Sequence, residues 1–160
     1  MTRSAQAEQA DSTVAPSAAL ECCLRLARAY AVLTRRLDNA LGSVHGLSFG
    51  DFMVLYYLQR APGARLRRID LAERLGLTAS GVTRTLLPLE KLGLVARQAD
   101  ARDARVGYAV LTKAGQRLLA HATASAESIG AEAMQSVPAD QVDAVAALLG
   151  QLAGINLSNA

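Results

Sequence analysis

The chain has 160 residues, of which 51% are hydrophobic, and a formal net charge of +3. This length suits one well-buried domain, and no apolar run is long enough to span a membrane. The polar first 16 residues lack the basic-then-apolar pattern of a secretion signal, so we expect a cytoplasmic protein with a disordered tail over residues 1–16. Cys22 and Cys23 are adjacent and cannot pair within a helix, and no metal-ligand spacing occurs, so we expect neither a disulfide framework nor a metal site.

The charges are unevenly distributed along the chain. Residues 65–117 contain eleven basic and five acidic side chains, whereas residues 118–160 contain no basic and four acidic ones. This segregation is typical of a segment that binds a polyanion, flanked by segments with another role. A solvated charged surface is the alternative interpretation.

Two helices are predicted in the first third of the chain. Residues 17 to about 41 carry apolar side chains at steps of three and four: Leu26, Tyr30, Leu33, Leu37 and Leu41. The second helix begins at Ser48, which can form a capping box with Asp51, and it ends before the segment APGA. Its sequence FMVLYYLQ is almost entirely apolar, so we expect this helix to be buried.

Residues 67–93, RRIDLAERLGLTASGVTRTLLPLEKLG, have the pattern of a helix-turn-helix. A short first helix places Ile69, Ala72 and Leu75 on one side, and Gly76 can end it in a left-handed conformation. Thr78 can cap the second helix, whose expected buried side carries Val82, Leu86 and Leu89 and whose opposite side carries Ser80, Gly81, Thr83, Arg84, Leu87 and Pro88. Because proline removes a helical hydrogen bond, we expect a bend or an early end at Pro88.

A β-hairpin is predicted directly after the helix-turn-helix. Residues 94–98 and 106–112 have strand patterns, and a charged loop joins them. Such a hairpin forms a wing whose tip can enter a narrow minor groove, where negative potential attracts an inserted arginine. The Asp103 carboxylate can bind the Arg105 guanidinium and fix its orientation. The alternative is that aspartate and arginine merely pair across a solvated turn.

Two further helices follow the hairpin. Thr112 can cap the first, which carries Leu118, Leu119, Ala122, Ile129 and Ala133, and Pro138 can open the last, which carries Val142, Val145, Leu149 and Leu152 on one stripe. Together they expose more apolar surface than one small winged domain can cover. A symmetric homodimer is the simplest solution, and packing within one chain is the alternative.

The order of these segments and three of their motifs resemble the MarR family of winged helix-turn-helix transcriptional regulators. The motifs are ASGVTR, LEKLGLVAR, and Asp103-x-Arg105 followed after five residues by LT-x-x-G, and the resemblance covers about residues 17–155. It implies a mainly α fold with a small β-hairpin wing, in a single domain over residues 17–160. Within it, residues 48–112 would form the winged helix-turn-helix lobe, and residues 17–45 and 113–155 the dimerisation helices. The chain departs from the family pattern at Pro88, where a polar residue is common, and at Ala104, where many members have arginine.

The resemblance also implies that the chain binds double-stranded DNA as a homodimer, at a palindromic operator, and more commonly as a repressor. The expected DNA-binding residues are Thr78, Ser80, Thr83, Arg84, Arg97, Asp103 and Arg105. Arg84 can donate two hydrogen bonds to a guanine in the major groove. Arg65, Arg67, Arg68 and Arg74 join Arg97 as candidates for phosphate contacts.

The resemblance implies a small anionic or aromatic effector rather than a cofactor, with Arg28, Arg35, His45, Tyr56 and Tyr57 as candidate contacts. Two alternatives stay open: a thiol-based redox sensor that uses Cys22 or Cys23, and a winged helix that binds proteins and not DNA. Catalysis is not expected, because the two histidines lie far apart in sequence and no phosphate-binding glycine loop or nucleophile elbow occurs.

Overall fold

The computed structural model describes residues 15–103 and 106–154. The chain has two compact units, Met1–Val32 and Leu33–Ala160. The first unit contains the beginning of α1 (Ala18–His45), and the second contains the end of α1 and every later element. In the described residues no helix is both long and apolar enough to cross a membrane.

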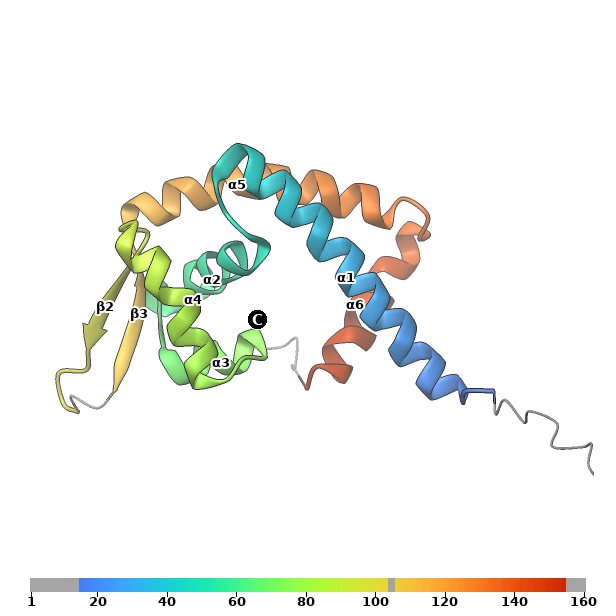
Figure 1. Ribbon diagram of the computed structural model, residues 1–160, viewed down its shortest axis with the longest axis horizontal. Helices are drawn as coiled ribbons and strands as arrows, with labels where there is room; N and C mark the ends of the chain where they lie inside the picture. Colours follow the sequence, from blue (N-terminus) through green and yellow to red (C-terminus); the bar gives the residue numbers. More distant parts are fainter. Residues whose placement is uncertain (1–14, 104–105, 155–160) are drawn as a thin grey trace, which may run out of the picture. The chain divides into compact units, whose positions relative to one another are not determined.

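The second unit is mainly helical and contains one small antiparallel sheet, as the sequence predicts (Figure 1). After α1 the elements are α2 (Phe49–Arg60), a 3₁₀ turn (Pro62–Ala64), β1 (Arg65–Arg67), α3 (Arg68–Leu75), α4 (Ala79–Lys91), β2 (Val95–Ala99), β3 (Gly107–Leu111), α5 (Lys113–Met134) and α6 (Ala139–Leu152).

Hydroxyl side chains cap three of these helices, as predicted. Ser48 accepts the amide of Asp51, and the Asp51 carboxylate accepts the amide of Ser48, which completes a capping box at α2. Thr78 accepts the amide of Gly81 at α4, and Thr112 accepts the amide of Gly115 at α5, both at 3.1 Å. These bonds satisfy amides that have no partner inside the helix.

The helix-turn-helix is confirmed, with one correction on its first helix. Gly76 ends α3 with φ 63°, in the left-handed region that glycine adopts without strain. Leu71 and Ala72 are the buried residues of α3, whereas Ile69 is 70% exposed. Ile69, predicted on one side of this helix with Ala72 and Leu75, is therefore not part of its inward stripe, which runs through Leu71, Ala72 and Leu75.

The second helix buries Val82, Leu86 and Leu89, as predicted, and it continues past Pro88 to Lys91. The predicted early end at Pro88 is therefore wrong. Leu86 and Leu89 lie on either side of the proline and are almost fully buried, so core packing holds the helix together across the lost hydrogen bond.

The sheet has the order β1-β3-β2, and the predicted hairpin forms its β2 and β3 strands. The third strand, β1, was not expected. It pairs antiparallel with β3, so that Leu66 lies opposite Ala109 and both side chains are buried. The helix-turn-helix thus lies between two strands that meet in one sheet.

The core of the second unit is built mainly from leucines and valines of α1, α2, α3, α4 and the sheet, with Phe52 and a few alanines, together with Leu119 and Ala122 of α5. In contrast, α6 contains no buried residue. Of the stripe predicted on this helix, Val142 and Val145 are half-buried, whereas Leu149 and Leu152 are 41% and 67% exposed. The described chain therefore covers this stripe only in part.

Candidate nucleic-acid interface

The outward face of α4 carries all but one of the residues that the helix-turn-helix pattern predicts. Ser80, Thr83, Arg84, Leu87 and Pro88 are exposed, and the buried residues lie on the opposite side of the helix. Gly81, also predicted on the outward face, is half-buried. The Thr78 cap and the left-handed Gly76 fix the short turn between α3 and α4. This geometry presents one full side of α4 to an approaching partner.

The hydroxyl groups of this region are bonded within the protein. Thr83 Oγ1 donates to the Ala79 carbonyl at 3.0 Å, and the hydroxyls of Thr78 and Ser80 lie 3.1 Å apart. Arg84 is exposed, and within the described residues its guanidinium has no ion-pair partner. Arg84 is thus the one cationic group at the centre of the outward face.

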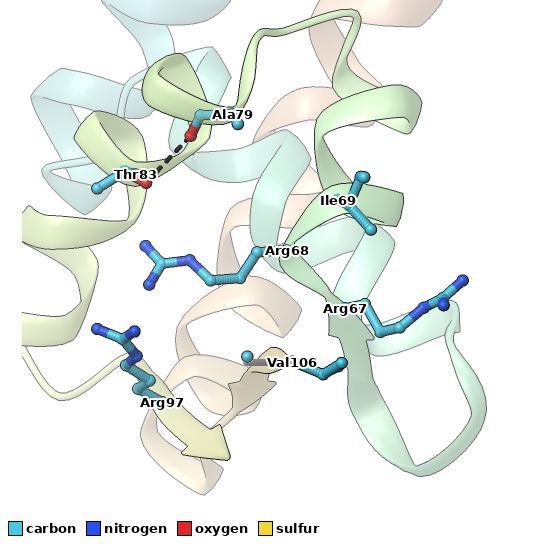
Figure 2. A pocket seen from close by; sticks show the side chains of 8 residues that line it. Arg67, Arg68, Ile69, Ala79, Thr83, Arg97 and Val106 are labelled. Atoms are coloured by element: carbon cyan, nitrogen blue, oxygen red, sulfur yellow. Dashed lines mark hydrogen bonds between the residues drawn. The ribbon is translucent and has the colours of Figure 1, made fainter. Parts of the chain in front are cut away.

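A groove of about 440 Å³ lies beside α4, where α3, α4 and the hairpin meet. The residues that line it are Arg67, Arg68, Ile69, Ala79, Thr83, Arg97, Val106 and Gly107. Figure 2 shows the side chain of Arg68 extending toward the helix that carries Thr83, and that of Arg67 extending the other way. Segments from before and after α4 thus contribute cationic groups to one concave surface.

Of the arginines that line this groove, Arg67 is neutralised by a neighbour. Its guanidinium donates two hydrogen bonds to Asp70, at 2.7 and 2.8 Å, in the forked geometry that favours both charges. This hydrogen bonding raises the pKa of Arg67 above its usual range. Arg68 and Arg97 have no ion-pair partner in the described residues, so they supply the available positive charge of the groove.

The loop at the tip of the hairpin is organised by Asp100. Its carboxylate accepts the amides of Arg102 at 2.7 Å and of Asp103 at 3.2 Å, and these bonds lower the pKa of Asp100. The Asp103 carbonyl accepts the amide of Val106, which closes the loop. Sequence reasoning missed this role of Asp100, although an aspartate two and three residues before the amides that it binds is the signal of such a turn. Arg105, which the sequence analysis placed in the minor groove, lies outside the described residues.

Two of the candidate phosphate contacts lie elsewhere. The Arg65 guanidinium stacks over the Tyr108 ring, 4.9 Å from its centroid, and lies 3.3 Å from Gln98 Oε1. In the sheet register these residues share the face opposite to Leu66 and Ala109. Arg74 is half-buried near the end of α3. The groove therefore brings together Arg67, Arg68 and Arg97, but neither Arg65 nor Arg74.

The residues that were expected to bind an effector lie on α1 and α2. His45 Nε2 lies 2.9 Å from Ser125 Oγ, at a contact between the end of α1 and α5. Tyr56 and Tyr57 of α2 meet edge to face at 5.9 Å between centroids, and Arg60 lies over the Tyr56 ring. Arg35 is exposed on α1, and Arg28 belongs to the first unit. Cys22 and Cys23, also in the first unit, are free and exposed.

Comparisons with known proteins support the winged helix-turn-helix fold. Residues 45–106 match the sequence model of the MarR family. Among solved structures, Sco3205, a MarR family transcriptional regulator from Streptomyces coelicolor in complex with DNA, shares 24% identity and superposes with a TM-score of 0.78, covering 89% of this chain and 91% of that one. The transcriptional regulator BldR from Sulfolobus solfataricus shares 25% identity with a TM-score of 0.76, over 84% of this chain and 93% of that one.

A third similar structure is CouR from Rhodococcus jostii RHA1, bound to p-coumaroyl-CoA, with 23% identity, a TM-score of 0.73 and coverage of 82% of this chain and 91% of that one. These likenesses establish the fold over most of the chain, and the family model matches the segment that contains the helix-turn-helix and the hairpin. Residues 45–106 therefore match the MarR family, and the chain has the winged helix-turn-helix fold of the MarR family transcriptional regulators to which it is similar.

Proposed function

We propose that the chain is a sequence-specific regulator that binds double-stranded DNA through α4 and the adjoining groove. The observation that supports this most strongly is the gathering of Arg68 and Arg97 from separate elements into a groove beside the outward face of α4, where Arg84 is exposed. A helix of this kind enters the major groove of DNA, and flanking cations neutralise the phosphates on either side.

Each cationic residue has a distinct role in this proposal. Arg84 donates two hydrogen bonds to a guanine, whereas Arg68 and Arg97 bind backbone phosphates. The hydroxyls of Thr78, Ser80 and Thr83 are bonded within the protein and serve mainly to shape the helix end. Arg105, held by Asp103, enters the adjacent minor groove and strengthens binding with less effect on major-groove preference.

The proposed assembly is a homodimer, formed by the helices over residues 17–45 and 113–155 of a single domain. The exposed leucines of α6 support it, since apolar side chains in water favour association with a second copy. A twofold dimer would read two half-sites about one DNA turn apart, so the operator is a palindrome.

The proposed regulation is repression that a small anionic or aromatic ligand relieves. The similar CouR structure is bound to p-coumaroyl-CoA, a larger ligand whose acyl group is aromatic. In this chain the candidate contacts are the aromatic pair Tyr56 and Tyr57, His45 at its contact with Ser125, and Arg28 and Arg35 on α1. A dimer that occupies a promoter represses by excluding the polymerase.

A selection from fragmented genomic DNA of the source organism, at about 150 mM salt, tests this function. We expect enrichment of a palindrome, and an affinity for it that falls steeply as salt increases, because each neutralised phosphate releases counterions. A protein-interaction winged helix would enrich no sequence and would show no such salt dependence on duplex DNA.

The redox alternative is tested separately, with peroxide added to the protein–DNA complex. Under the proposed function, peroxide leaves DNA binding unchanged in the wild type and in Cys22→Ser and Cys23→Ser alike. Release of DNA by peroxide in the wild type that either substitution abolishes would establish a thiol sensor instead.

A further inference from the structure

The outward face of α4 is more apolar than a typical DNA-reading surface. Leu87 is 48% exposed, although leucine is usually buried. At about 100° per residue it lies between Thr83 and Arg84, near the centre of the exposed side of the helix. Pro88, beside it, is also exposed and carries no hydrogen-bonding side chain. The exposed apolar side chains at the centre of this face therefore favour contact with an apolar group of the partner.

Thr83 contributes to the same apolar surface. Its hydroxyl donates to the Ala79 carbonyl at 3.0 Å, so the donor is used within the helix. Figure 2 shows the Thr83 methyl group on the side away from that bond. Ser80 has its hydroxyl 3.1 Å from that of Thr78. Between Ser80 and Pro88, Arg84 alone offers a charged donor on this face, and the next one, Lys91, lies one turn further along the helix.

The major groove of DNA contains one apolar group, the C5-methyl of thymine. Because Arg68 and Arg97 flank α4 with positive charge, the partner that meets this face carries negative charge close to the apolar contact. A thymine beside its phosphate satisfies both requirements. We infer that Leu87 and Thr83 read thymine methyl groups next to the base pair that Arg84 reads. This inference rests on the proposed function and specifies what each half-site contains: one guanine flanked by thymines.

The test uses DNA in which only the methyl groups change. A duplex is first selected from a random library with the full-length chain, and each thymine is then replaced in turn by deoxyuridine, which keeps every hydrogen-bonding group and lacks the C5-methyl. At one or two positions in each half-site we expect binding about fourfold weaker, the value of one methyl group that loses its apolar contact. At the other thymines we expect no change.

Paired variants then assign the methyl contacts to residues. Thr83→Ser keeps the hydroxyl and removes the methyl, whereas Thr83→Val keeps methyl groups and removes the hydroxyl. We expect Thr83→Ser to bind one thymine and its deoxyuridine equally, and Thr83→Val to discriminate them as the wild type does. Leu87→Ala should abolish discrimination at the other position. Since Leu87 and Thr83 are both exposed, the unfolding temperature should stay that of the wild type.

Thr85 provides the matched control on the same helix. Its hydroxyl donates to the Gly81 carbonyl at 3.0 Å, the same type of bond that Thr83 makes, but Thr85 is half-buried on another side. Thr85→Ser should leave the deoxyuridine profile unchanged.

The outcomes separate this inference from the function on which it rests. Failure to enrich any duplex contradicts the proposed function. Enrichment of a duplex whose binding is indifferent to deoxyuridine at every position overturns the methyl-reading inference alone. Sensitivity to deoxyuridine that survives both Thr83→Ser and Leu87→Ala overturns the assignment to these residues.

Discussion

At the scale of single residues, the helix caps and the turn were accessible from sequence because their signals are local. The structure confirms four such signals, each of which bonds to backbone groups only a few residues away: the caps Ser48, Thr78 and Thr112, and the helix end at Gly76. The composition of the groove was not accessible in this way. Which arginines face it depends on how α3 packs against the hairpin, and that is set by contacts between segments distant in sequence.

Arg84 leads to the first prediction at this scale. Replacement of Arg84 by alanine should relax specificity at one position of each half-site, with a loss of about 1–3 kcal/mol on the preferred base pair. Binding selections on operator variants measure this directly. Arg117→Ala, which removes an exposed arginine on α5, is the control and should leave the preference unchanged. Equal weakening on all sequences would mean that Arg84 contacts the backbone.

Asp100 leads to the second prediction. Bonds from the amides of Arg102 and Asp103 lower its pKa below the ordinary value of 3.8, so they favour the ionised carboxylate. The order that Asp100 gives to the loop is therefore fully present above pH 3.8 and is lost as the pH falls through the lowered pKa. The amide proton shifts of Arg102 and Asp103 should titrate together below pH 3.8. In Asp100→Ala both should already have their low-pH shifts at neutral pH.

At the scale of elements, the sequence predicted every helix and both strands of the hairpin, and it missed β1. A three-residue strand with one buried side chain, Leu66, has too short an alternation to be distinguished from a loop. Its partner is β3, which lies beyond the whole helix-turn-helix in sequence. The strand therefore exists because of a pairing between distant segments and not because of its own pattern.

The junction of α5 with the hairpin leads to a prediction at this scale. Thr112 donates to the carbonyls of Gly93 and Leu94, and a Cβ at Gly115 would collide with the Leu94 carbonyl and the Leu111 side chain. Gly115→Ala should therefore lower the free energy of unfolding by about 1–3 kcal/mol, the cost of overpacking, as measured by urea denaturation. Gly130→Ala is the control on the same helix. It has open space around it and should be neutral or slightly stabilising.

At the scale of the whole molecule, the sequence indicated association, because its C-terminal helices carry more apolar surface than the lobe can cover. In the structure this exposed apolar surface lies on α6, which has no buried residue, whereas α5 packs on the core through Leu119 and Ala122. The arrangement of the two copies depends on contacts between chains, and no pattern within one chain encodes their geometry.

The proposed dimer leads to the fourth prediction. Leu152→Glu should weaken self-association by about tenfold or more, because it places a charge where an apolar side chain would be buried. Sedimentation equilibrium gives the dissociation constant, and circular dichroism should show an unchanged helix content since Leu152 is 67% exposed within the chain. Gln151→Glu adds the same charge at an exposed polar neighbour and should have little effect. A wild-type chain that is monomeric at micromolar concentration would contradict the dimer.

The pairing of β1 with β3 has a consequence for how the molecule opens. These strands bracket α3 and α4, so the helix-turn-helix lies inside a chain loop that the sheet closes. Separation of β1 from β3 removes the constraint on both ends of that loop and increases its entropy. We therefore expect the amides of α3, α4 and the sheet to lose protection from hydrogen exchange together, as one cooperative unit. The proposed DNA-binding surface would then be either intact or absent, with no stable half-open form.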